Sequence, residues 1–354
     1  MKVEFNNLLD IYENIICKNC HNKKKIYNFE KNKMTVLYDL YIKLNNNKYT
    51  MGNYNIFLIR RPKHRIVMSL NVTDKIVNHY ITLNHIIPTL ERYLDNRNIA
   101  TRKEMGNDYG IKLLKKYLEE NKKYDKFYVL KLDIKKYFYN IDHDILKSMI
   151  KDKFNSDIFN FLCEIIDSTD KEYINNTIRK IKNHELEKAY IDDIKNLPYY
   201  NKGKGLPIGN MTSQFFAIYY LSSLDHYIIH DLHLKHYIRY MDDFIIIHNN
   251  KDYLRKCKKI IENKLINEYK LELNQKSKIF DSVNGFDFLG YNFKVIDKKT
   301  IMRISNKSYN YIKHNIKCMN NSIDDFGTYV NYYNSFKYCN NCKIKYLIDK
   351  HYEN

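Results

Sequence analysis

Tryptophan is absent from this sequence of 354 residues, and glycine and proline are scarce, with 9 and 4 residues. Lysine, asparagine, isoleucine and tyrosine are over-used instead, which is the composition that an AT-rich genome imposes on any protein it encodes. No run of about 18 apolar residues is present, and residues 1–10 have neither the basic start nor the apolar block of a signal peptide. We therefore expect a soluble, cytoplasmic protein that does not enter a membrane.

Cysteine, with 7 residues at irregular spacing, does not form the pattern of a disulfide framework. Two pairs have the spacing of metal-binding cysteines, Cys17 with Cys20 and Cys339 with Cys342. Together they would supply four thiolates for a zinc ion, but they lie at opposite ends of the chain. Zinc binding by these cysteines therefore stays open beside the simpler interpretation, which is incidental thiols.

The charge of the chain is strongly positive, with Lys+Arg 60, Asp+Glu 41 and a net charge of +19. A hydrophobic fraction of 44% is enough for a folded core, so the excess charge belongs to a globular surface. Such a surface attracts polyanions, of which nucleic acid is the commonest. Because an AT-rich genome also favours lysine, the charge alone only suggests a nucleic-acid partner.

The first hundred residues have the pattern of a helical extension followed by a basic hairpin. Residues 1–48 carry apolar side chains at helical spacing and a run of lysines. Two short β-rich segments, 54–59 and 66–70, flank a basic cluster and predict a hairpin. A helix is expected over 74–90, with Thr73 as its N-cap.

The middle of the chain has the strongest strand signals. Residues 128–134 are β-rich and contain Asp133 near their end. Residues 236–240 and 244–248 are two apolar strands separated by Met241-Asp242-Asp243, which predicts a hairpin with two carboxylates at its tip.

The other segments are assigned by periodicity and by glycine content. The only glycine-dense part of the chain is 203–209, where a phosphate or a base could approach the backbone closely. Helices are predicted over 110–120, 151–200, 211–227 and 251–269, strands over 271–278 and 284–293, and two helices in the remaining tail.

The carboxylates at the hairpin tip are the first sign of chemistry. Asp242 and Asp243 repel each other unless a cation compensates, and Mg²⁺ prefers such oxygen ligands. Aspartates are common in turns, so this pair alone is weak. Asp133 adds a third carboxylate if its strand neighbours the hairpin in one antiparallel sheet. That arrangement is the palm of a polymerase, where paired metal ions serve phosphoryl transfer.

Several motifs occur in the order seen in reverse transcriptases, and the chain resembles that family from about Tyr54 to Tyr291. They are Leu132–Phe138 (LDIKKYF), Gly205–Gln214 (GLPIGNMTSQ), Tyr240–Asp243 (YMDD), Asn274–Ser277 (NQKS) and Gly285–Tyr291 (GFDFLGY). The resemblance implies an α+β right-hand polymerase with an N-terminal helical extension (1–48), fingers and an antiparallel palm (49–294) and a small helical thumb (295–354). It also implies an RNA-directed DNA polymerase, a nucleotidyltransferase that binds RNA template, DNA or RNA primer and dNTPs, with two Mg²⁺ ions for which Mn²⁺ substitutes.

The family's catalytic roles map onto four positions of this sequence. Asp133 and Asp242 resemble the ligands that hold both metal ions, and Asp243 resembles their supporting neighbour. Lys276 matches the lysine proposed as general acid for the pyrophosphate leaving group; an exposed lysine at a strand end is the alternative.

The family's binding roles fall on further residues. Phe138 matches the aromatic gate that crowds a ribose 2′-OH, with a core aromatic as the alternative. Lys63 and Arg65 match basic fingers positions for the triphosphate, or are plain surface charges. Gly209 and Gln214 resemble the element that lines the nucleotide and the template, and the resemblance places the primer grip at Phe286, Leu289 and Gly290.

The subtype is suggested by one residue. Group II intron enzymes usually have proline where Gln214 stands, whereas diversity-generating retroelement enzymes have glutamine there. In that family the enzyme works with a small basic accessory protein and a structured RNA. Antiphage-defence (abortive-infection) reverse transcriptases, a catalytically inactive RNA-binding scaffold and a viral RNA-dependent RNA polymerase remain alternatives.

Overall fold

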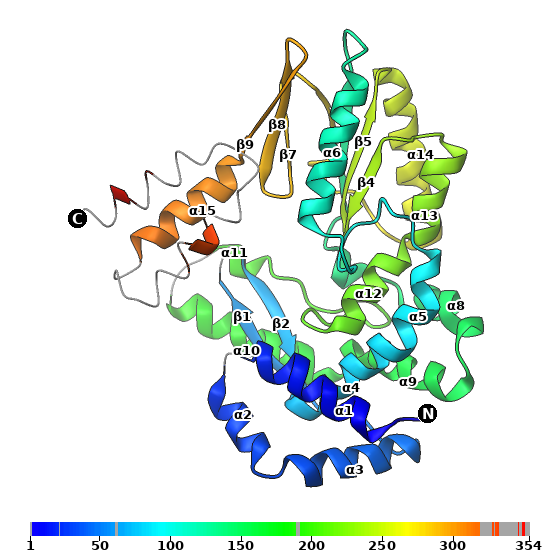
Figure 1. Cartoon of the computed structure of the whole chain (residues 1–354), viewed down its shortest axis with the longest axis vertical. Helices are drawn as coiled ribbons and strands as arrows, with labels where there is room; N and C mark the ends of the chain where they lie inside the picture. The colour runs from blue at the N-terminus through cyan, green and yellow to red at the C-terminus, as the bar shows by residue number, and fades with distance from the viewer. Residues whose placement is uncertain are drawn as a thin grey trace. The chain divides into compact units, whose positions relative to one another are not determined.

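The computed structural model describes residues 2–20, 22–60, 63–188 and 192–318, with a few isolated positions up to 350 (Figure 1). Cys339, Cys342 and the second helix expected in the tail lie outside these residues. The described elements are a mixture of helices and antiparallel sheets, so the predicted α+β class is confirmed. No helix in the described ranges is long and apolar enough to cross a membrane.

The chain divides into two compact units. The first contains Met1–Thr101, Ile134–Asp231 and Ile261–Leu273, and the second contains Arg102–Asp133, Leu232–Ile260 and Asn274–Asn354. Each unit is built from several stretches of sequence.

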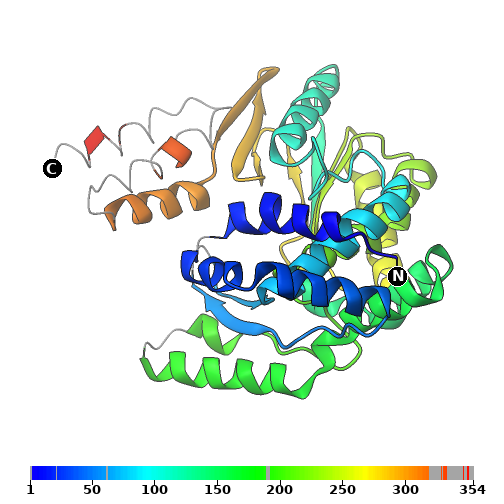
Figure 2. The same cartoon turned by 60° about the horizontal axis from the view of Figure 1, so that its bottom comes forward.

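The first unit begins with the expected helical extension. Its helices are α1 (Phe5–Ile11), the π-helical turn η1 (Tyr12–Cys17), α2 (Lys23–Glu30) and α3 (Lys33–Asn45). Contacts between α1 and α3 hold them together, and these blue helices lie side by side in Figure 2. Leu8 and Ile11 are buried as their helical spacing requires.

The basic hairpin is confirmed as β1 (Asn55–Ile59) paired antiparallel with β2 (Arg65–Ser69). One face of it is buried, because Ile56, Ile66 and Met68 belong to a core cluster that also includes side chains of α10. The next helical stretch contains α4 (Val72–Ile81), η2 (Thr82–Ile86), α5 (Ile87–Leu90) and η3 (Glu91–Tyr93). Its N-cap is Asn71, not Thr73: the Asn71 side chain accepts a hydrogen bond from the Asp74 N–H at 2.7 Å.

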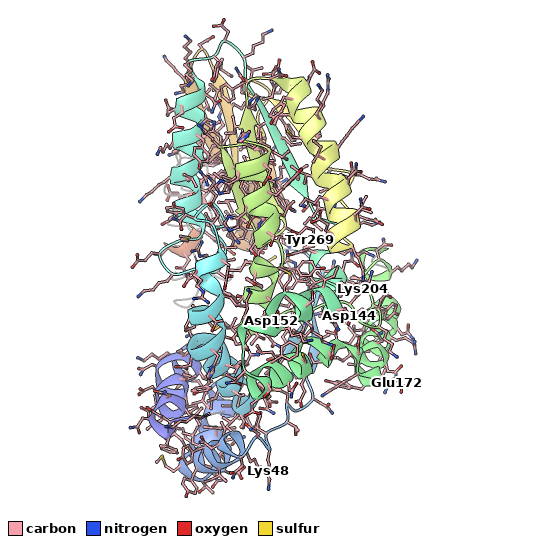
Figure 3. All side chains as sticks on the ribbon, turned by 90° about the vertical axis from the view of Figure 1, so that its right-hand side faces the viewer. Lys48, Asp144, Asp152, Glu172, Lys204 and Tyr269 are labelled. Atoms are coloured by element: carbon pink, nitrogen blue, oxygen red, sulfur yellow. The ribbon has the colours of Figure 1, made fainter. Side chains whose placement is uncertain are left out.

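The rest of the first unit is helical. Its elements are α7 (Tyr137–Asn140), α8 (His143–Ile150), η4 (Lys151–Lys153), α9 (Ser156–Ile166), η5 (Asp167–Asp170), α10 (Glu172–Lys188), α11 (Asp192–Lys195), α12 (Met211–Tyr220), α13 (Ser222–His226) and η6 (Tyr227–Asp231). Asp142 caps α8, accepting a hydrogen bond from the Ile145 N–H. Asp225 is fully buried in α13. All residues labelled in Figure 3, among them Asp144 and Glu172, belong to this unit.

The second unit is organised around a four-stranded antiparallel sheet of order β4-β5-β3-β6. The strands are β3 (Tyr128–Asp133), β4 (Tyr237–Tyr240), β5 (Asp243–His248) and β6 (Lys278–Asp281). Consecutive residues Phe244 to Ile247 are all buried, so both faces of β5 are covered. Helix α6 (Asn107–Asn121) packs along β4 and β5 (Figure 1), and α14 (Lys251–Tyr269) follows β5 in the chain.

A second sheet, β7-β8-β9, also belongs to this unit. Its strands are β7 (Phe286–Phe288), β8 (Tyr291–Ile296) and β9 (Lys299–Ile304), and α15 (Asn306–Lys317) follows them. Two sequence predictions are wrong here. Residues 295–304, assigned to a helical thumb, form strand, because Asp297 and Lys298 adopt positive φ and turn the chain back into a hairpin. Within 271–278, where a strand was expected, only Lys278 belongs to a strand (β6), Leu273 forms an isolated bridge, and the others are irregular or in a turn.

Candidate active site

The pairing of β3 with β5 brings two predicted catalytic aspartates together. Asp133, the last residue of β3, is the register partner of Asp243, the first residue of β5. Tyr240 pairs with Asp243 across the hairpin, so Met241 and Asp242 alone form its turn. The sequence had suggested that Asp243 lies at the hairpin tip. In the structure it is the first residue of β5. The sheet itself places all three aspartates at one end of its central strands.

A buried arginine supports the turn. Arg239, on β4, is fully buried, and its Nη1 donates a hydrogen bond to the Met241 carbonyl at 3.0 Å. Met241 has a φ of 55°, a left-handed conformation that an unbranched residue adopts only when its surroundings impose it. The hydrogen bond from the guanidinium is one such constraint. Sequence patterns did not single out Arg239, since an arginine in an apolar strand carries no motif.

The electrostatics of the site centre on Asp243. Its Oδ2 lies 3.0 Å from the Lys131 Nζ, while its buried Oδ1 has no hydrogen-bond partner. Burial raises the pKa of Asp243 to about 6; Lys131 lowers it, and the neighbouring carboxylates of Asp133 and Asp242 raise it further. A nearby cation would stabilise the ionised form of such a carboxyl group.

The donor set fits a divalent metal ion. It consists of hard carboxylate oxygens, one of which is buried without a partner, and the repulsion between the carboxylates needs a counter-charge. Among the described residues, the oxygens of Asp133, Asp242 and Asp243 are not all within 4.8 Å of one another. Asp243 is held by Lys131, so a shared ion would have to compete with this lysine for the carboxylate.

The turn with the predicted general acid contacts Asp133. The Asn274 N–H donates to the Asp133 carbonyl at 2.7 Å, and the Asp133 N–H donates to Ser277 Oγ at 3.0 Å. Lys276 lies between these two residues and is exposed. The motif is therefore attached to the end of β3 by its polar residues. Ser277 was missed by sequence reasoning, although it stands inside a motif already identified.

The predicted primer-grip residues form the turn between β7 and β8. Phe288 pairs with Tyr291, and Leu289 and Gly290 have φ values of 48° and 85°, as a two-residue hairpin turn requires. Phe286 is buried, so it anchors the hairpin and does not offer its ring to solvent. The Lys131 Nζ donates to the Asp287 carbonyl at 2.7 Å, which ties β7 to β3.

The predicted nucleotide-binding residues lie in the first unit. Lys63 lies two residues before β2, and Arg65 is the first residue of β2; both are exposed. Gln214 on α12 is also exposed. Gly209 contacts β2: a Cβ there would lie 2.9 Å from the Met68 carbonyl oxygen, and the φ of Gly209 is +123°. Phe138, on α7, is half-buried beside Tyr137.

Carboxylates at the ends of paired antiparallel strands are the arrangement expected in the palm of a nucleic-acid polymerase, where paired metal ions serve phosphoryl transfer. The family model for reverse transcriptase (RNA-dependent DNA polymerase) matches residues 47–293, so the chain belongs to this family. The predicted enzyme class, an RNA-directed DNA polymerase of the nucleotidyltransferases, and the right-hand polymerase fold are thereby confirmed. Members of the family bind an RNA template and generally use divalent metal ions. A search of curated proteins found no match.

Solved structures of telomerase are similar at low identity. Apo telomerase from Candida tropicalis, truncated from its C-terminal domain, is 16% identical with a TM-score of 0.48, covering 72% of this chain and 55% of that one. Apo telomerase from the same organism is 18% identical with a TM-score of 0.46, covering 80% and 52%. Telomerase from Candida albicans, solved with a fragment of telomeric RNA, is 12% identical with a TM-score of 0.47, covering 87% and 60%. The present chain therefore spans little more than half the length of these relatives.

Proposed function

We propose that this chain copies an RNA template into DNA by metal-dependent nucleotidyl transfer at Asp133, Asp242 and Asp243. The observation that carries this proposal is the β3–β5 register, which sets Asp133 opposite Asp243 with Asp242 in the adjoining turn. The family match supplies the direction of synthesis, from RNA to DNA.

In this mechanism the three aspartates hold two Mg²⁺ ions, with Mn²⁺ as a substitute. Bound there, the ions would lower the pKa of the primer 3′-hydroxyl and neutralise the pyrophosphate that leaves the dNTP. Asp133 and Asp242 provide the main ligand oxygens. Asp243, whose pKa is raised to about 6 by burial, is largely ionised at neutral pH, and a bound cation would favour the ionised form further.

Other residues orient the reactants. Lys63 and Arg65 are exposed cations suited to the triphosphate, and Phe138 would crowd a ribose 2′-OH and so select dNTPs. Gly209 packs closely against β2, where a Cβ would meet the Met68 carbonyl oxygen, and Gln214 faces solvent at the start of α12. In this proposal the two residues line the nucleotide and the template.

Two elements next to the aspartates serve the primer and the leaving group. Lys276 is exposed, and its turn is hydrogen-bonded to the Asp133 backbone. This attachment would keep the lysine near the leaving pyrophosphate, to which it would donate a proton. The hairpin that contains Phe286, Leu289 and Gly290 would support the primer's 3′ end. Lys131 bonds both to Asp243 and to this hairpin, which keeps the two elements in register.

We retain the domain assignment as part of this proposal: a helical extension over 1–48, fingers and palm over 49–294, and a thumb over 295–354. The thumb would begin with β9 and α15 and not with helix alone. The net charge of +19 supports binding of the template–primer duplex through its phosphates. Affinity should then fall steeply with added salt.

For the biological role we propose the reverse transcriptase of a diversity-generating retroelement, working with a small basic accessory protein and a structured RNA in the cytoplasm. Gln214 carries this preference. An antiphage-defence enzyme is the second candidate. Sequencing of the cDNA separates them, because the first role predicts frequent misincorporation opposite template adenines and faithful copying of the other bases.

Primer extension tests the activity. With an RNA template, a DNA primer, dNTPs and Mg²⁺, the wild-type protein should make DNA, and the Asp242→Asn, Asp243→Asn double variant should make none. Asp252→Asn, an exposed aspartate paired with Arg255 on α14, is the matched control and should extend like wild type. Equal extension by wild type and the double variant, or use of NTPs only, contradicts the proposal.

A further inference from the structure

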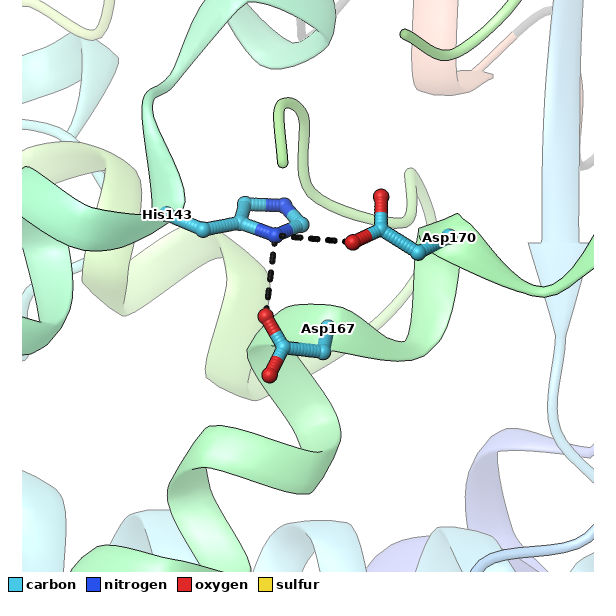
Figure 4. Close-up of side chains that lie close together, drawn as sticks. All are labelled: His143, Asp167 and Asp170. Carbon is cyan, nitrogen blue, oxygen red and sulfur yellow. Dashed lines mark hydrogen bonds and ion pairs between the residues drawn. The ribbon is translucent and has the colours of Figure 1, made fainter. Parts of the chain in front are cut away.

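A buried histidine and two aspartates meet in the first unit, among residues that the polymerase proposal does not use. His143 is the first residue of α8, and Asp167 and Asp170 begin and end η5. One ligand atom from each of the three side chains lies within 4.8 Å of the others, as Figure 4 shows. Among the described residues, this is the group of His, Cys, Asp or Glu side chains whose ligand atoms lie close enough together to share one metal ion.

The hydrogen bonds of His143 determine which of its nitrogens carries a proton. Its Nε2 lies 2.7 Å from the Gly205 carbonyl oxygen, which can only accept, so Nε2 is protonated and donates. Its Nδ1 faces carboxylates instead, at 3.1 Å from Asp167 Oδ1 and 3.8 Å from Asp170 Oδ2. A neutral ring would therefore point a lone pair at two negative groups. A metal ion held by this nitrogen and the two carboxylates would remove that repulsion.

We propose that His143 Nδ1 and one oxygen each from Asp167 and Asp170 bind a divalent transition-metal ion of the Zn²⁺ type, with water completing the coordination. Tetrahedral ligands with bonds of about 2.1 Å are separated by roughly 3.4 Å. The distances of 3.1 and 3.8 Å from Nδ1 bracket this value. Histidine ligands of metals commonly donate their other N–H to a backbone carbonyl, as His143 does to Gly205.

Burial and charge agree with a dication at this place. The His143 side chain is 1% exposed, whereas the Asp170 side chain is 25% exposed, so an ion can enter from the aspartate side. Lys147 Nζ lies 2.6 Å from the Asp167 carboxylate and compensates one of the two negative charges. The charge of Asp170 is left to face the imidazole ring. Imidazole with carboxylates suits zinc and similar ions better than Mg²⁺.

The ion would stabilise the turn that leads to the Gly209–Gln214 segment. The Gly205 carbonyl accepts hydrogen bonds from His143 Nε2 and, at 2.9 Å, from Thr169 Oγ1. The Gly203 N–H donates to Asp170 Oδ1 at 2.8 Å. Two of the proposed ligands thus hold the turn directly, and coordination would fix them to each other. The role of this site is structural.

The test uses the full chain carrying Asp242→Asn and Asp243→Asn as parent, so that ions at the proposed catalytic aspartates do not contribute. Into it are introduced His143→Gln, whose amide can still donate to Gly205, or Asp170→Asn, which keeps the acceptor for Gly203. Asp144→Asn, an exposed neighbour on α8, is the matched control. Co²⁺ is the probe, measured as ions bound per chain and by its visible absorption, since cysteine ligands would add a thiolate charge-transfer band in the near ultraviolet.

The parent and the Asp144→Asn chain should bind one Co²⁺ more than either ligand variant, with visible bands and no thiolate band attached to that ion. Zn²⁺ should compete for it and raise the unfolding temperature of the parent but not of Asp170→Asn. Equal stoichiometry in all four chains overturns the proposal. Far-ultraviolet circular dichroism checks that each variant is folded, and Asp170→Asn alone suffices should His143→Gln fail to fold. Because the parent is catalytically silenced, the result does not depend on polymerase activity.

Discussion

Lys131 Nζ lies 3.0 Å from Asp243 Oδ2 and 2.7 Å from the Asp287 carbonyl oxygen, so a single side chain joins the carboxylate site to the hairpin of β7 and β8. The lysine stands two residues before Asp133 on β3, and the pleat points both side chains to the same face of the sheet. It supplies a positive charge to Asp243 when no metal ion does, and it competes with an ion that does bind.

Replacing Lys131 by methionine should shift the acid limb of the pH–rate profile to higher pH at limiting Mg²⁺. The lysine lowers the pKa of Asp243, so its loss leaves that carboxyl protonated to a higher pH and slower to accept a metal ion. Lys278→Met is the matched control, because Lys278 is the register partner of Lys131 on β6. A rate that falls equally at every pH, with no shift of the limb, would show that Lys131 acts only by holding the hairpin.

Asp243→Asn should stabilise the metal-free protein, and increasingly so as the pH rises. The pKa of Asp243 is about 6 in the folded state against 3.8 for the free side chain, so the folded state binds more protons between these values. Its contribution to stability therefore decreases as the pH rises from 4 to 6, and the loss is complete above pH 6. The difference between variant and wild type should reach up to about 3 kcal/mol.

Urea unfolding at pH 4.5 and pH 7.5 in EDTA measures this difference, with Asp252→Asn as the control whose stability should follow wild type at both values. Saturating Mg²⁺ should restore the stability of wild type at the higher pH and leave Asp243→Asn unchanged. A variant less stable than wild type at pH 7.5 without metal would contradict the burial of an uncompensated carboxylate.

Phe138→Ala should relax the choice between dNTPs and NTPs. Removing the half-buried ring opens space where a ribose 2′-OH would sit, and we expect the preference for dNTPs to fall by roughly tenfold or more, in line with shape-based discrimination. Ratios of kcat/KM for dGTP and GTP in single-nucleotide extension measure the change. Tyr139→Phe keeps a ring at the neighbouring position and should leave the ratio as it is. An unchanged ratio in Phe138→Ala would assign this residue to the core.

Gly209→Ala should be more damaging than Gly203→Ala. Both glycines have positive φ, +123° and +70°, but only at Gly209 would the new Cβ collide, at 2.9 Å from the Met68 carbonyl oxygen; at Gly203 nothing lies within 4 Å. We expect a loss of about 1 kcal/mol for Gly203→Ala and roughly 2–3 kcal/mol for Gly209→Ala. Thermal unfolding compares the stabilities, and the KM for dNTP should rise only in Gly209→Ala. Equal losses would mean that β2 moves aside freely.

Local patterns were sufficient for most elements. The apolar runs around Asp133 and Asp242 predicted the strands, because a strand buried on both faces has consecutive apolar residues. The periodicity over 251–269 predicted α14 to the residue, because a helix buried along one stripe repeats its apolar residues every three to four positions. Where competing signals were similar, the prediction failed. Thr73 and Asn71 are both of residue types that cap helices, but α4 begins directly after Asn71, which is therefore its N-cap. Residues 295–304 became a hairpin because of a turn at Asp297 and Lys298 that contains no glycine.

The sequence by itself determined the class of this protein, because the aspartates and their neighbouring motifs stand in a fixed order along the chain. This order can be read from the sequence without knowing the fold. It identified Asp133, Asp242 and Asp243 as candidates but could not show that Asp133 faces Asp243, because strand register depends on pairing between residues 110 positions apart. Only the tertiary structure placed Lys131 against Asp243, Arg239 beneath the Met241 turn, and His143 beside Asp167 and Asp170. Those contacts join distant segments through buried polar groups, and no local pattern encodes which buried charge will meet which partner.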